Sequence, residues 1–151
     1  MTPIEVLKKL GLLNWSNIYV GIKKGWATKE DAIEYAVGLL QVGCDEEGIA
    51  LIAGGEQLEE DELIKLISQS TSKNNSAVEL DKWRMGYLIS ISESGDDAQT
   101  QLDRLQEVYA NFNYPEDMAA CSIYSQSSTQ PLVAMEQVVK ELKHRFGIPI
   151  V

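Results

Sequence analysis

The sequence predicts an all-α protein. Apolar residues recur at spacings of three or four along nearly all of the 151 residues, which is the period of an amphipathic helix. Helix-start residues precede several of these stretches, as at Pro3, Thr28 and Pro131, and glycines such as Gly25 follow them. A chain of this length buries enough apolar surface to fold without a disulfide or a metal. We therefore expect a single compact domain of about seven to nine helices over residues 1–151.

The N-terminal half is expected to contain five helices. Thr28, followed by Lys-Glu-Asp, is the strongest start signal because it combines an N-cap with an acidic first turn. Its helix carries an apolar stripe that we expect to face the core, formed by Ile33, Ala36, Val37 and Leu40. The expected ranges are about 3–13, 15–25, 28–43, 45–54 and 59–70.

A polar loop over residues 70–76 divides the chain near its middle. Two independent domains of about half the chain each would be small, so we favour two helical halves that share one core. A repeat-like array of helices is a second arrangement that the pattern allows, although no clean period establishes one.

The C-terminal half is expected to hold a helix from about Leu80, although residues 87–92 also have the composition of a strand. A turn at residues 94–97 leads into a helix that Pro115 stops, and a new helical turn begins there. The last helix is expected over residues 131–147. The apolar tail after it, residues 148–151, either packs on the body or forms an edge strand.

The charge is strongly acidic and uneven. The formal net charge is −10, and residues 31–64 alone hold ten acids and no Lys or Arg. Nucleic-acid binders concentrate positive charge, so direct DNA or RNA binding is not expected, and an anionic membrane would repel the chain as well. The acidic segment has two interpretations: a solvated face that aids solubility, or a docking surface for a basic partner.

Residues for catalysis or cofactor binding are few. His144 is the only histidine, and its neighbours Lys143 and Arg145 indicate a solvated helix end rather than a general base. Glu141 and His144 form one Glu-x-x-His pair, whereas a di-iron bundle needs two. Cys44 and Cys121 form no Cys-x-x-Cys motif. We expect no enzyme activity, no metal, no cofactor and no membrane span, and we expect a cytoplasmic protein.

Two stretches carry a resemblance to a known family. They are residues 15–36, with Trp-Ser-Asn-Ile-Tyr at the start and Gly-Trp in the middle, and residues 108–118, which read Val-Tyr-Ala-Asn-Phe-Asn-Tyr-Pro-Glu-Asp-Met. Together they resemble a family of small, acidic bacterial proteins described as a domain of unknown function, over most of the chain. Its members look like immunity proteins of bacterial toxin systems, such as contact-dependent inhibition. The resemblance implies a protein that binds a cognate toxin and blocks it, and it supplies no catalytic residues.

The function predicted from these observations is neutralisation of a basic bacterial toxin, such as a nuclease, through an acidic surface. The alternatives are a helical adaptor or scaffold with a different partner and, third, a hydrolase with paired carboxylates. The predicted partner-binding residues are the acids of the segment's second half: Asp45, Glu46, Glu47, Glu56, Glu59, Glu60, Asp61 and Glu62.

Overall fold

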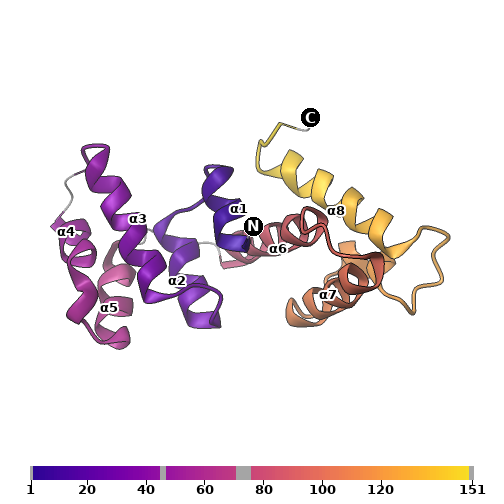
Figure 1. Ribbon diagram of the computed structural model, residues 1–151, viewed down its shortest axis with the longest axis horizontal. Helices are drawn as coiled ribbons and strands as arrows, with labels where there is room; N and C mark the ends of the chain where they lie inside the picture. The colour runs from indigo at the N-terminus through magenta and orange to yellow at the C-terminus, as the bar shows by residue number, and fades with distance from the viewer. Residues whose placement is uncertain (1, 45–46, 71–75, 150–151) are drawn as a thin grey trace. The chain divides into compact units, whose positions relative to one another are not determined.

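A computed structural model describes residues 2–44, 47–70 and 76–149 (Figure 1). Within these ranges the chain forms eight α-helices and two short 3-10 helices, and no strand, so the predicted all-α class is confirmed. The elements in order are α1 (Pro3–Lys9), α2 (Trp15–Lys24), α3 (Lys29–Gln41), α4 (Glu47–Ala53), η1 (Gly55–Gln57), α5 (Glu60–Ser70), α6 (Ser76–Ser92), α7 (Ala98–Asn111), η2 (Glu116–Cys121) and α8 (Pro131–Arg145).

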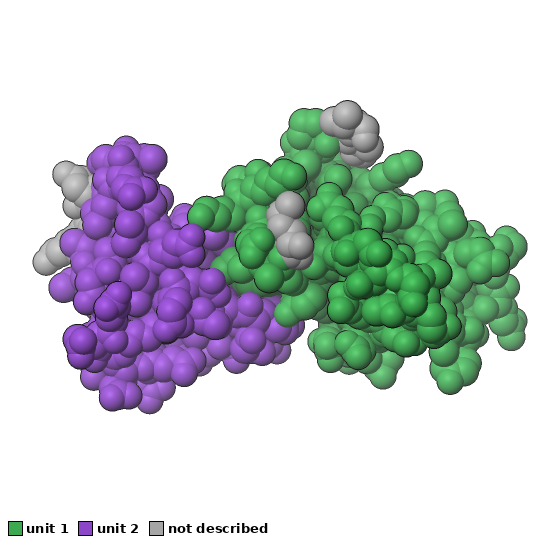
Figure 2. Space-filling model, viewed as in Figure 1, with its two compact units in different colours: residues 1–12, 80–151 green, residues 13–79 purple. Residues whose placement is uncertain are grey.

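The chain divides into two compact units (Figure 2). Unit 1 contains residues 1–12 and 80–151, and unit 2 contains residues 13–79. The division after residue 79 lies close to the predicted polar loop, of which residues 71–75 are outside the described residues. That the two units form one domain, or a repeat-like array, stays a prediction.

Unit 2 is built from α2, α3, α4, η1 and α5. Helix α2 packs against α3 and α5, and α4 packs against α3, η1 and α5. Its interior holds the apolar residues that the helical period places inward, among them Ile18, Ile49, Ile52, Leu63 and Ile67. Helix α2 begins with a reciprocal cap, in which the backbone N–H groups of Asn14 and Asn17 each donate to the other side chain at 2.9 and 2.8 Å. Helix α3 begins with the predicted Thr28 cap.

Unit 1 has a single apolar core to which α1, α6, α7, η2 and α8 all contribute. Its buried members include Leu88, Leu105, Met118, Met135 and Leu142. Helices α7 and α8 pack against each other and against η2. Trp83 of α6 is fully buried.

Several boundaries differ from the expectation. The first helix ends at Lys9 rather than near Leu13, because Gly11 adopts a left-handed conformation, with φ of 72°, that terminates the helix. Residues 87–92 are helical, so the strand alternative is wrong. The helical turn expected to begin at Pro115 is present as the 3-10 helix η2. In the tail, Ile148 and Pro149 have no regular structure, and residues 150–151 are outside the described residues.

The predicted core stripe of α3 is also wrong in part. Its buried residues are Ala32 and Ala36, whereas Val37 and Leu40 are each 39% exposed. The two alanines of α3 are therefore fully buried, Tyr35 packs edge to face on Trp15, and Val37 and Leu40 remain partly exposed.

A glycine sets the packing of α6 in unit 1. A Cβ atom at Gly86 would lie 3.0 Å from the backbone oxygen of Pro3, whereas a Cβ at Gly38 in α3 would meet nothing within 4 Å.

Both glycines are helical, so alanine should gain helix propensity at both, and at Gly38 nothing offsets that gain. We expect Gly38→Ala to raise the unfolding free energy by about 0.5–1 kcal/mol. We expect Gly86→Ala to be at least about 1 kcal/mol less stable than Gly38→Ala, because its methyl group presses on backbone. Urea denaturation of both variants measures this difference; equal stabilities would contradict the close approach.

Candidate functional site

The predicted partner-binding acids fall into a described and an undescribed group. Glu56 lies in η1, Glu59 directly precedes α5, and residues 60–62 form its first turn; all five side chains are exposed. Glu47 begins α4, and its side chain is not described, while residues 45–46 lie outside the described residues. The structure thus places five of the eight predicted side chains on the surface of unit 2.

The acids at the start of α5 have a local physical reason to be there. The Glu59 carbonyl accepts the Leu63 N–H at 3.0 Å, so the helix begins at this point. Negative side chains at a helix N-terminus interact favourably with its unpaired N–H groups. Part of this charge therefore stabilises α5. The four consecutive acids exceed what capping requires, and together they form a dense negative surface.

Lys29 joins this surface to α3. Its Nζ donates to the backbone oxygens of Glu56 and Leu58 at 2.5 and 2.6 Å. These bonds hold η1 against the first turn of α3, and a shallow pocket of about 420 Å³ lies there. The pocket is lined by Lys29, Glu30, Ile33, Glu34 and Glu56. It brings Glu30 and Glu34, which were not among the predicted contact residues, next to Glu56.

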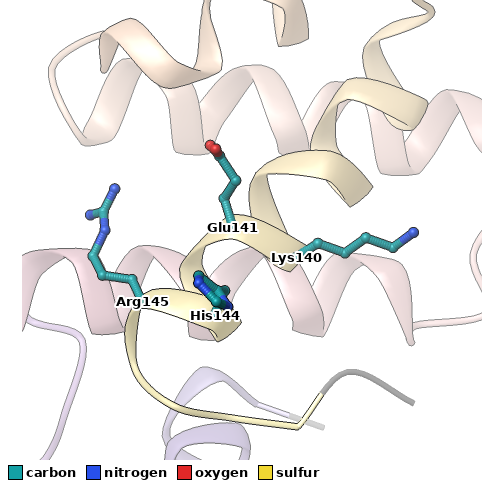
Figure 3. A pocket seen from close by; sticks show the side chains of 4 residues that line it. All are labelled: Lys140, Glu141, His144 and Arg145. Carbon is teal, nitrogen blue, oxygen red and sulfur yellow. The ribbon is translucent and has the colours of Figure 1, made fainter.

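The single histidine lies on the surface of α8 (Figure 3). It lines an open pocket of about 450 Å³ with three residues of the same helix, Lys140, Glu141 and Arg145. His144 and Glu141 are both exposed, and the Glu141 carboxylate points away from the imidazole. Among the described residues, no three His, Cys, Asp or Glu side chains are grouped closely enough to hold a metal ion.

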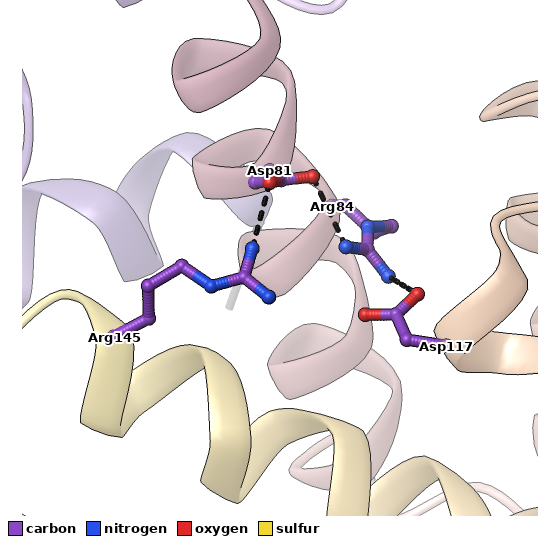
Figure 4. A network of polar contacts seen from close by, with 4 residues as sticks. All are labelled: Asp81, Arg84, Asp117 and Arg145. Carbon is purple, nitrogen blue, oxygen red and sulfur yellow. Dashed lines mark hydrogen bonds and ion pairs between the residues drawn. The ribbon is translucent and has the colours of Figure 1, made fainter.

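A buried arginine in unit 1 was not singled out by the sequence (Figure 4). The Arg84 side chain is only 5% exposed, and its two terminal nitrogens contact Asp81 at 3.0 Å and Asp117 at 2.6 Å. Asp81 also accepts from Arg145 at 2.9 Å. These four residues link α6, η2 and α8. The i, i+3 spacing of Asp81 and Arg84 was visible in the sequence, but the partners on η2 and α8 depend on the tertiary fold.

The two cysteines differ in environment. Cys121 is fully buried, and burial, with a smaller contribution from the negative charge of Asp117, raises the pKa of its thiol to about 11. The thiol is therefore protonated near neutral pH, whereas a nucleophilic cysteine would have to be a thiolate. Cys44 is only partly buried.

The fold and the surface define an acidic, all-helical protein that carries a dense negative surface on unit 2. The chain belongs to the DUF2247 family, described as uncharacterized proteins conserved in bacteria, whose model matches residues 4–146. No curated protein and no solved structure matches it significantly. Within the described residues, none of the helices combines the length and the apolar composition that crossing a bilayer requires.

The Arg84 network predicts an unequal cost for two aspartate deletions. Asp117→Ala leaves a nearly buried guanidinium with only one carboxylate, so we expect a loss of about 1–3 kcal/mol of unfolding free energy. Asp96→Ala breaks the exposed pair with Arg104 and should cost less than about 1 kcal/mol. Thermal and urea unfolding of the two variants would test this, and equal losses would show that burial of Arg84 contributes little.

Burial also predicts the reactivity of the thiols. In native protein at pH 8, iodoacetamide should modify Cys44 and leave Cys121 unmodified, because Cys121 is inaccessible and protonated. Both should react after denaturation. Intact-mass and peptide mass spectrometry distinguish the sites; rapid native modification of Cys121 would contradict the packing of η2.

Proposed function

We propose that this chain is a bacterial immunity protein that binds a basic cognate toxin in the cytoplasm and neutralises it through the acidic surface of unit 2. The observation that carries the proposal is the exposure of Glu56, Glu59 and residues 60–62 on one unit. Unit 2 has five Lys and twelve Asp or Glu, a net charge of −7, so it holds most of the molecule's negative charge.

Charge complementarity gives this surface a specific physical role. A negative surface steers a basic partner during diffusion and raises the association rate, up to about 10⁸–10⁹ M⁻¹s⁻¹ at low salt. The same field repels nucleic acid, so the protein does not compete with the toxin for a nucleic-acid substrate. In this proposal the chain performs no catalytic step; inhibition follows from occupying the basic surface that the toxin needs.

The test compares two variants with the same change in net charge. In one, Glu59, Glu60, Asp61 and Glu62 are replaced by Lys. In the matched control, four exposed acids of unit 1 are replaced by Lys: Glu93, Asp103, Glu107 and Glu116. Both variants change the net charge from −10 to −2, so a global charge effect is equal in the two.

The partner to test is the product of the gene next to the one that encodes this chain, after its toxicity to cells has been established. Stopped-flow association of the purified pair should be at least about tenfold slower for the α5 variant at low salt, with a flatter salt dependence. The control should lie within about threefold of the wild type. Protection of cells that express the toxin should fall with the α5 variant and not with the control. Equal effects of both variants, or no effect of either, would contradict the proposal, and binding without protection would favour the adaptor alternative.

A further inference from the structure

Helix α3 leaves large apolar residues partly exposed beside the face that packs against the rest of unit 2. Ala32 and Ala36 are fully buried, and α3 packs against α2, α4 and η1. The larger Val37 and Leu40 are each 39% exposed. Small residues at a helix contact allow the backbones to approach closely, which explains the buried alanines. Val37 and Leu40 are larger than these alanines, yet each keeps more than a third of its surface accessible.

These outward residues form one continuous face. At 100° per residue, positions 30, 33, 34, 37 and 40 fall on the same side of the helix. The face therefore runs from two carboxylates, Glu30 and Glu34, over the partly exposed Ile33 to Val37 and Leu40. Its apolar members, Ile33, Val37 and Leu40, follow the i, i+4, i+7 spacing by which a helix presents apolar anchors to a partner.

Three carboxylates surround the N-terminal part of this face. Glu30, Glu34 and Glu56 line the pocket of about 420 Å³ together with Ile33. The one cation of the lining, Lys29, is held by the backbone oxygens of Glu56 and Leu58. An apolar surface with a negative border matches a segment that carries apolar residues on one side and Lys or Arg at its edges.

We propose that the outward face of α3 is a docking surface for a basic amphipathic segment of a partner protein, with Ile33, Val37 and Leu40 as its apolar anchors. The inference rests on the proposed function insofar as the partner is the same basic protein. Acidic residues at α5 would then set the rate of encounter, and the anchors on α3 would slow dissociation, because charge contributes more to association rate than to affinity. A second copy of this chain is a poor occupant, since it would bring like charges together.

The experiment uses two synthetic peptides as probes and the full-length protein. One is an 18-residue amphipathic helix of Leu and Lys, and the other has the same lysines with every Leu replaced by Ser. Backbone amide NMR shifts locate the binding site, and fluorescence anisotropy measures the affinity. We expect the Leu-Lys peptide to shift amides of residues 30–41 and to bind at least about tenfold more tightly than the Ser-Lys peptide.

Three variants separate the contributions. Val37→Ser with Leu40→Ser should weaken the Leu-Lys peptide at least about tenfold and leave the Ser-Lys peptide unchanged. Glu30→Gln with Glu34→Gln and Glu56→Gln should weaken both peptides. The matched control, Ile123→Ser with Val133→Ser, removes two aliphatic side chains of unit 1 that are at least as exposed and should change neither. Circular dichroism checks that all three are folded.

Several results would overturn the inference. In the NMR experiment, these are amide shifts confined to residues 59–62, or no shifts in α3 with either peptide. In the affinity measurement, it is a control pair that weakens the Leu-Lys peptide as much as Val37→Ser with Leu40→Ser does. In light scattering, it is a wild-type dimer that Val37→Ser with Leu40→Ser makes monomeric. Failure of the toxin experiment together with peptide binding at α3 would reject the proposed function and leave this docking surface intact. Toxin neutralisation without peptide binding at α3 would support the proposed function and reject this docking surface.

Discussion

Neutralisation of one buried charge constrains the arrangement of unit 1. A guanidinium cannot lose its protons in a protein, so Arg84, once enclosed, must be compensated by fixed acceptors. Asp81 lies one helical turn away, whereas Asp117 must be brought in on η2. The short helix between α7 and α8 is therefore held at a position where its carboxylate reaches Arg84 while Met118 and Cys121 enter the core. Arg145 adds α8 to the same network through Asp81.

This constraint gives a structural account of the second stretch on which the family resemblance rests. The end of α7 passes through two residues with positive φ, Asn113 at 63° and Tyr114 at 54°, which is uncommon for residues other than glycine. The Tyr114 N–H donates to the Tyr109 carbonyl at 2.8 Å, and the two rings meet edge to face. The tight reversal directs the chain into η2, where Asp117 meets Arg84. The stretch thus encodes a turn and an ion pair, which explains why its residue types indicate no chemistry.

The local signals of the sequence were sufficient for most helix positions. Capping at Thr28, the glycine after α2 and the prolines at the starts of α1 and α8 act within a few residues, so they can be read without the fold. The orientation of α3 could not be read in this way. Its apolar residues cover more than one face, and which face packs inward depends on the surfaces that α2, α4 and η1 offer. The acidic residues of α5 were identifiable by composition. The position of Glu30 and Glu34 beside Glu56 in the pocket was not, because it depends on the contact that Lys29 makes with η1.

The two surface features of unit 2 carry opposite costs. Consecutive acids at residues 59–62 repel one another, and the N-terminus of α5 offsets only part of that repulsion. Exposed aliphatic residues on α3 forgo burial that a different orientation of the helix would have supplied. Both features are therefore expected to lower the free energy of unfolding of unit 2. A solvated face explains the acids alone, but it gives no reason for Val37 and Leu40 to lie beside a carboxylate-lined pocket. The basic amphipathic partner that we propose would account for both features, because its cations would relieve the repulsion and its apolar side would recover the lost burial.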